Sequence, residues 1–239
     1  MLANDIDSEC IYVIAGFVAY ILACSPASMR MHLEPLKSTV EETARILDSK
    51  GLFPPLPSEL GGKDFTESLE DGDLQFEVDP KYPQSMGISS ILSQTMIFGN
   101  SKWDILVNPF NDNPFFTSDF PVAIEMFDGF RIFNRIIPLT PQLAIRIIPD
   151  RSIDRKSIDF SFSNFRQTVR KLKLRDAMYI NELIVRCAET IVFFRDDYEW
   201  IPKFVKKNAR FRIESRTIRI PNGDGTLHSS TLEVREAGK

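Results

Sequence analysis

The sequence predicts an α+β fold, in which helices and an antiparallel sheet occupy separate stretches of the chain. Three observations lead to this prediction. Apolar helical patterns fill the chain before residue 102, short β-rich runs broken by turn residues follow, and helical spacing returns after residue 160. Helices, then strands, then a helix indicate α+β rather than alternating βαβ units.

We expect one α+β domain over residues 1–197 and a small appendage over residues 198–239. Within the domain, we expect helices in 1–101, an antiparallel meander of four to five strands in 102–149, and a long helix in 160–195. The appendage is expected to hold a short helix and a terminal β-hairpin. A chain of 239 residues can bury a core without disulfides or metals.

The first part of the chain predicts three helices. Residues 7–29 are expected to form one apolar helix. Ser38 and Glu41 have the capping-box spacing that begins a helix, and Gly51 is placed to end it. Ser85–Phe98 predicts the next apolar helix.

Five short runs predict the strands of the meander: Trp103–Val107, Phe115–Thr117, Val122–Phe127, Phe130–Ile137 and Leu143–Ile148. Asp128-Gly129 separates two of them. This dipeptide is the strongest short signal for a hairpin, because a type I′ turn needs positive φ.

The remaining elements come from the second half of the chain. Apolar residues at helical spacing predict a helix over 163–191. Val192–Phe194 is expected to be a last sheet strand, and residues 199–207 a short helix. Phe211–Ile220 and Thr226–Val234 flank a glycine-rich turn, which predicts the terminal hairpin.

Composition excludes several classes of protein. Apolar residues make up 43% and charged residues 26%, a globular balance that excludes collagen, coiled-coil and disulfide-scaffold proteins. Only His32 and His228 are present, so a histidine-rich metal site is excluded, and we expect no metal ligands. Three cysteines without metal-motif spacing predict a reduced, cytoplasmic protein. No cofactor motif is recognised, so the cofactor is left unknown.

The uncharged run from Cys10 to Cys24 has two interpretations. Fifteen residues are too few for a confident transmembrane helix. The acidic flank, with Asp5, Asp7 and Glu9, does not fit a signal peptide. We therefore expect a buried helix and no stable membrane insertion, with a membrane-associated helix as the alternative.

Charge is distributed unevenly along the chain. Residues 1–130 hold 7 Lys and Arg against 20 Asp and Glu, a net charge of −13, whereas residues 131–239 have a net charge of +9. The two halves therefore either attract each other within one fold or leave a basic binding face. The candidate phosphate or nucleic-acid contacts are the basic residues on the exposed side of the predicted helix, with a solvated face as the alternative: Arg166, Arg170, Lys171, Lys173 and Arg175.

The densest polar segment, residues 111–122, lies where predicted strands end, a common position for sites. Asp119 is the candidate general base, and Ser118 the candidate nucleophile or hydrogen-bond donor. Thr117 and Asn113 are candidate binding residues. The alternative is structural, because these residue types also cap turns by binding nearby backbone.

Asn181 and Glu182 are further candidate binding residues within the apolar helix. A buried Asn needs hydrogen-bond partners. Asn181 therefore either ties the helix to the backbone at the strand ends or faces a ligand.

The order of several motifs resembles a known family. They are Phe17-Val-Ala-Tyr20 with Ser25-Pro26, Asp112 to Val122 containing Thr-Ser-Asp-x-Pro, Ile137-Pro-Leu-Thr-Pro141, and Asn181 with Val192-Phe193. This pattern is similar to the prokaryotic Domain of Unknown Function 4238 family, over residues 10–197. Fuller members open with a His-x-Val-Pro motif that this chain lacks, so it resembles the later part of the family. The resemblance implies no substrate.

Three functions are compatible with these observations. The first is a cytoplasmic binding or regulatory protein with a polar pocket around Asp119 and a protein partner. The second is a metal-assisted hydrolase or nuclease using Asp119, with nucleic acid held by the basic second half. The third is a membrane-associated protein through residues 10–24. The absence of a catalytic histidine or cofactor motif favours the first.

Overall fold

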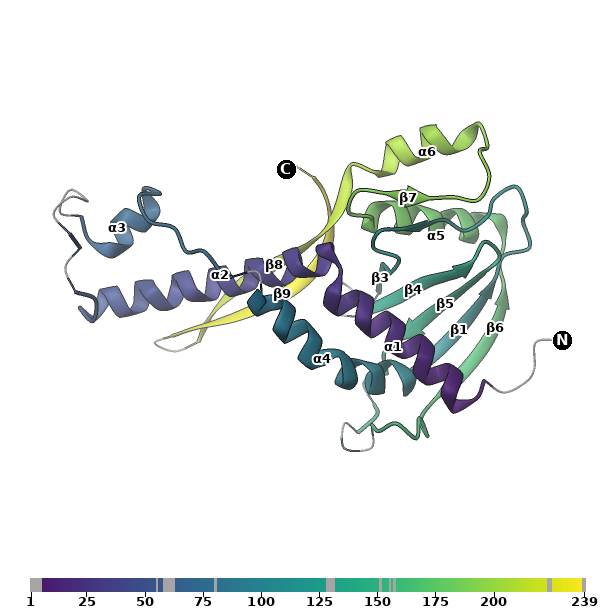
Figure 1. The fold of residues 1–239 in the computed structure, drawn as a ribbon, viewed down its shortest axis with the longest axis horizontal. Helices are drawn as coiled ribbons and strands as arrows, with labels where there is room; N and C mark the ends of the chain where they lie inside the picture. Colours follow the sequence, from purple (N-terminus) through teal and green to yellow (C-terminus); the bar gives the residue numbers. More distant parts are fainter. Residues whose placement is uncertain are drawn as a thin grey trace.

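The computed structural model describes residues 6–54, 56–57, 63–79, 81–127, 132–150, 152–154, 156, 158–222 and 225–237. It confirms the α+β class, with helices around a five-stranded sheet and a C-terminal hairpin (Figure 1).

Four helices precede the sheet: α1 Ser8–Cys24, α2 Pro26–Ser49, α3 Phe65–Glu70 and α4 Lys81–Gly99. The single helix predicted for residues 7–29 is wrong, because α1 and α2 meet at an angle of 56°. Ser25 between them has an extended backbone, and its hydroxyl accepts a hydrogen bond from the Ser28 amide at 3.2 Å. Pro26 lacks an amide and starts the new helix without losing a bond.

The start of a helix predicted at Ser38 is also wrong, because α2 runs through this position. The predicted end at Gly51 agrees with the structure. Gly51 follows the helix cap with a φ of 66°, a left-handed conformation that glycine adopts without a steric cost. Among the described residues, no single helix is long and apolar enough to cross a membrane; α1 and α2 pass that test only as a bent pair.

The main sheet has the order β3-β4-β5-β1-β6, with these bounds: β1 Lys102–Val107, β3 Ala123–Phe127, β4 Ile132–Thr140, β5 Leu143–Ile148 and β6 Arg166–Lys171. The first four strands in this order are antiparallel, as predicted. β3 and β4 pair as a hairpin would, although the Asp128-Gly129 turn lies outside the described residues.

Two predicted strands do not join the main sheet. β2 (Thr117–Ser118) and β7 (Val192–Phe193) instead pair with each other as a separate two-stranded sheet. The main sheet gains a strand that was not expected. β6 occupies part of the helix predicted over 163–191, and that prediction is wrong before residue 174. β6 pairs in parallel with β1, so a partner distant in sequence satisfies its backbone.

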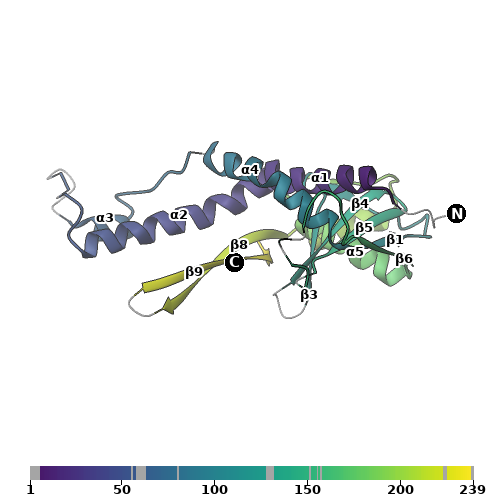
Figure 2. The ribbon, with the colours of Figure 1, turned by 90° about the horizontal axis from the view of Figure 1, so that it is seen from below.

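The later elements are α5 Leu174–Cys187, α6 Trp200–Asn208, and the hairpin of β8 Phe211–Asn222 with β9 Gly225–Glu236. α5 is shorter than the predicted helix at both ends, whereas the short helix and the terminal hairpin agree with the predictions. Residues 223–224 at the hairpin turn lie outside the described part. α2 packs beside β8, and α2 with α3 and the hairpin projects from the rest of the molecule (Figures 1 and 2).

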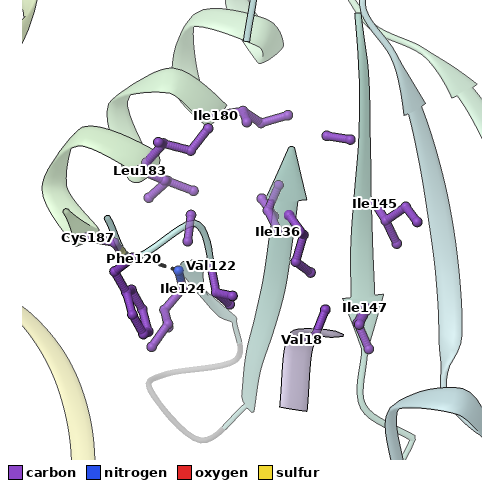
Figure 3. Close-up of a cluster of buried hydrophobic side chains, with 14 of the residues drawn as sticks. Val18, Phe120, Val122, Ile124, Ile136, Ile145, Ile147, Ile180, Leu183 and Cys187 are labelled. Atoms are coloured by element: carbon purple, nitrogen blue, oxygen red, sulfur yellow. Dashed lines mark hydrogen bonds between the residues drawn. The ribbon is translucent and has the colours of Figure 1, made fainter. Parts of the chain in front are cut away.

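The sheet is covered on both faces. Figures 1 and 2 show α1 and α4 across one face and α5 across the other. Both faces of β4 are buried, since neighbouring Ile136 and Ile137 are 0% exposed. Figure 3 shows Ile180 and Leu183 of α5 on one side of the strands and Val18 of α1 beside Ile147. Cys187 joins this core, where its sulfur accepts a hydrogen bond from the Ile124 amide.

Candidate functional site

The Asp119 carboxylate binds the backbone that follows α5. Its Oδ1 accepts a hydrogen bond from the Glu189 amide at 2.9 Å, and Oδ2 accepts from the amides of Thr190 at 2.7 Å and Ile191 at 3.1 Å. The Thr190 hydroxyl also donates to Oδ2. Together these bonds tie the end of β2 to the segment that leads into β7.

Ser118 is also engaged by the protein. It is buried, and its hydroxyl donates to the Phe120 carbonyl at 2.8 Å and accepts from the Phe120 amide at 3.2 Å. Asp119 therefore already accepts four hydrogen bonds, and Ser118 makes a closed local turn. The catalytic roles of these two residues remain predictions.

Replacing Asp119 with asparagine is expected to lower the free energy of unfolding by about 1–2 kcal/mol at pH 7. Partial burial opposes ionisation, but the hydrogen bonds from Thr190, Glu189 and Ile191 outweigh it and hold the pKa of Asp119 below its usual value. A lowered carboxyl pKa stabilises the fold above the unfolded pKa of about 3.9, and this stabilisation is lost as pH falls through the folded pKa. Urea unfolding should therefore show the difference at pH 7 and a smaller one near pH 3.

The control for this experiment is Asp112→Asn, because Asp112 is exposed and close in sequence. Its effect should stay within about 0.5 kcal/mol. An Asp119→Asn protein as stable as the wild type at pH 7 would contradict a tethering role and would return Asp119 to the candidates for chemistry.

Asn181 ties α5 to the strand-end segment. It is 0% exposed, its Oδ1 accepts from the Phe116 amide at 2.9 Å, and its Nδ2 donates to the Pro114 carbonyl at 2.9 Å. Glu182 beside it forms an ion pair with Arg186 along the helix. Both side-chain polar atoms of Asn181 are thus used by the backbone of the same chain.

Thr117 lines a small cavity that unites two motifs singled out in the sequence. This cavity of about 280 Å³ is bounded by Phe115–Thr117, by Pro138–Pro141 and by Phe193–Arg195. Asn113 lies outside it. Asn113 is 4% exposed, its carbonyl accepts from Asn108, and its Nδ2 has no hydrogen-bond partner among the described residues.

Among the described residues, carboxylates do not converge on Asp119, as a metal-assisted hydrolase would require. Within the described part of the chain, no group of three or more His, Cys, Asp and Glu residues could hold a metal ion. Asp104 lies on β1, where it meets Arg170 rather than Asp119. The geometry therefore offers no shared set of oxygen ligands around Asp119.

The five basic residues lie on an edge strand and a turn instead of on a helix face. Arg166 and Arg170 belong to β6, Lys171 ends it, Lys173 precedes α5 and Arg175 lies in its first turn. All five are exposed. Charges on an edge strand also prevent it from pairing with another chain, which is a structural role for part of this set.

A larger cavity, which sequence analysis missed, lies between α2, α4 and the β8–β9 hairpin. Its volume is about 560 Å³. Its walls are mostly apolar, with contributions from Met31, Leu36, Met86, Ile97 and Leu232. We call it the Arg135 cavity, because Arg135 is the single Lys, Arg, Asp or Glu among the described residues that line it.

Arg135 has no anionic partner within the described residues. Its Nε is buried and donates no hydrogen bond to a described residue, and no ion pair with a described residue reaches its guanidinium. Among the described residues, the charge makes a favourable contact with the Phe98 ring, whose centroid lies 4.9 Å from Cζ. A guanidinium without a counter-charge at the wall of an apolar cavity suits an anionic ligand.

The free-energy cost of holding the Arg135 charge in this place exceeds the gain from its ring contact. Burial lowers the pKa of Arg135 to about 10, well below its ordinary value. Each tenfold change in proton affinity corresponds to about 1.4 kcal/mol, so holding the charge here costs roughly 3 kcal/mol. The cation–π contact with the Phe98 ring offsets about 0.5–2 kcal/mol of this cost. A charge in the middle of the apolar strand run was the sequence signal for this site.

The family model described as "Protein of unknown function (DUF4238)" matches residues 3–198. The chain belongs to the DUF4238 family. No curated protein and no solved structure matches this DUF4238 member. The match includes Arg135, Asp119 and Asn181, whereas the β8–β9 hairpin that forms one wall of the Arg135 cavity follows the matched residues.

Proposed function

We propose that this DUF4238 member is a binding protein whose ligand occupies the Arg135 cavity. The ligand is an apolar molecule with one negatively charged group, such as a long-chain carboxylate. The observation that carries the proposal is the guanidinium of Arg135, which has no anionic partner among the described residues, at a mostly apolar wall. The apolar body would bury against the side chains of α2 and α4, and the carboxylate would pair with Arg135.

We also place the protein in the cytoplasm. The three free cysteines support this part of the proposal, since disulfides are rare in reducing compartments.

Calorimetric titration with decanoate, decanol and decylamine tests the ligand class. We expect decanoate to bind at least about tenfold more tightly than decanol, because a hydrogen bond to a charged group contributes about 1.5–3 kcal/mol. Decylamine should not bind measurably. Arg135→Met should abolish the preference for decanoate over decanol. Equal affinities for decanoate and decanol in the wild type, or no binding of either, would refute the proposal.

The unliganded stability of two arginine variants provides a second test. Arg30 is paired, with Nε and Nη2 at 2.9 and 2.7 Å from the Glu189 oxygens and Nη2 at 2.8 Å from the Ile213 carbonyl. Arg30→Met should lower the free energy of unfolding by about 1–2 kcal/mol. Arg135→Met should leave it unchanged or raise it, because an uncompensated charge is removed. A similar loss in both variants would show that Arg135 has a structural role.

A further inference from the structure

A second cavity, of about 660 Å³, opens on the other face of the same sheet. Successive side chains of a strand point to opposite faces. On β4, Asn134 therefore lines this second cavity, whereas its neighbour Arg135 lines the apolar one. We call it the sheet-face cavity, because its walls come from β1, β3, β4, β5 and β6, with Tyr179 of α5 at one side.

Two carboxylates hold the guanidinium groups of this cavity in place. Asp104 is 1% exposed, and its Oδ2 lies 2.9 Å from Nε of Arg170 and 3.9 Å from Nη1 of Arg146. Glu125 accepts from Nη2 of Arg146 at 2.9 Å and from Nδ2 of Asn134 at 2.9 Å. Arg170 is thus oriented from one side by a carboxylate, which is the usual preparation of an arginine for an anion, whereas Arg146 is held by both carboxylates.

Positive charge exceeds negative charge on this face. Lys102 and Arg166 are direct partners across β1 and β6, and like charges placed opposite each other destabilise a sheet. With Arg146 and Arg170 they make four cations around the carboxylates of Asp104 and Glu125. Asp150, whose charge also reaches Arg166, is already bound by Ser152. An anion at the β1–β6 edge would relieve this repulsion.

Two buried hydrogen-bond acceptors lie among these cations. Oδ1 of Asp104 and Oδ1 of Asn134 accept no hydrogen bond from a described residue, although the Lys102 ammonium lies 3.6 Å from Oδ1 of Asp104 as an ion pair. The Tyr179 side chain also lines this cavity. Buried acceptors of this kind call for hydroxyl or amino donors.

We propose that the sheet-face cavity binds a phosphate ester of a hydroxyl-rich body, the chemistry shared by sugar phosphates and nucleotides. The phosphate lies at Arg170, which lines the cavity, and extends to Arg166, which lies outside the cavity wall on the same face of β6. Hydroxyl groups of the body donate to Asp104 and Asn134. This site is separate from the Arg135 cavity, and the proposal stands or falls independently of the one made above.

Titration calorimetry at low salt tests the proposal with ribose 5-phosphate, AMP, inorganic phosphate and ribose. Ribose 5-phosphate or AMP should bind at least about tenfold more tightly than inorganic phosphate, and ribose should not bind measurably. The tighter of the two esters identifies the source of the phosphate. Equal binding of inorganic phosphate would overturn the proposal, because the Asp104 and Asn134 acceptors would then add nothing to the affinity for the ester.

The decisive variant is Arg166→Gln, because Arg166 is exposed and holds no buried carboxylate, so folding should be retained. It should weaken binding of the phosphate ester at least about tenfold. Lys203→Gln on α6 removes the same charge from a distant exposed position and should change affinity less than about twofold. Equal losses in the two variants, or tight binding of single-stranded DNA that both variants weaken equally, would overturn the proposal in favour of general electrostatic attraction.

Discussion

Replacing Asn181 with leucine is expected to lower the free energy of unfolding by about 2–5 kcal/mol. The substitution leaves the Phe116 amide and the Pro114 carbonyl without partners in the core, and each unpaired buried group costs about 1–3 kcal/mol. The effect should spread to the aromatic contacts of Phe116, whose ring lies 5.7 Å from Trp200. Urea unfolding followed by tryptophan fluorescence measures both consequences.

The neighbouring residue provides the control. Glu182→Gln removes only a surface ion pair with Arg186, so a loss of no more than about 0.5 kcal/mol is expected. A small effect of Asn181→Leu, close to that of Glu182→Gln, would mean that water or a ligand satisfies the strand-end backbone in solution. Asn181 would then be a contact for that ligand rather than a tether.

Replacing Gly87 with alanine is expected to destabilise the protein by about 1–3 kcal/mol, although alanine is the better helix former. α1 and α4 approach closely here. A Cβ on Gly87 would lie 2.5 Å from the Ala23 carbonyl oxygen and 3.3 Å from its Cα. Both are backbone atoms that cannot turn away as a side chain does, so the helices would have to separate. Thermal unfolding would report the loss as a lower Tm.

Gly16 is the matched control on the facing helix. Its Cβ would meet Thr95 side-chain atoms at 3.9 Å, an ordinary contact distance. Gly16→Ala should therefore raise stability, by up to about 1 kcal/mol, because only the helix propensity changes. Equal shifts in Tm for the two variants would contradict the close packing of α1 against α4.

Local sequence signals predicted the elements whose boundaries are set by a few neighbouring residues. Gly51 ends α2 with a positive φ, as its position suggested. The Phe211–Ile220 and Thr226–Val234 runs pair as a hairpin because the turn between them brings neighbouring segments together. In these cases the information is contained within a few residues, and sequence analysis alone reaches it.

β6 is a strand that local sequence signals do not predict. Its residues, Arg-Gln-Thr-Val-Arg-Lys, carry one large apolar side chain, and nothing local favours a strand over a helix. The strand forms because β1, some sixty residues earlier, offers a free edge. The same limit explains the prediction of a basic helix face. Arg166 and Arg170 share a face through the two-residue period of a strand.

The candidate site was predicted only in part from the sequence, for a similar reason. Asp119 and Asn181 were identified as polar residues in need of partners, and both have them, but their bonds join segments about seventy residues apart. Spacing along the chain does not reveal such partners. Arg135 was missed because it lies in a run read as an ordinary apolar strand, where its missing counter-charge becomes visible only after α2, α4 and the hairpin are assembled.

β4 and its short connection to β5 have one more consequence. Ile136 and Ile137 are buried on opposite faces, so the apolar residues would suit either face after a shift of one residue. Asn134 and Arg135 are not interchangeable in this way, because a shift would bring Arg135 to the face of Arg146. The pairing of Thr140 with Leu143 across Pro141-Gln142 and the register shift between Pro138 and Thr140 together fix the choice. This short stretch thus decides which side chains each face of the sheet presents.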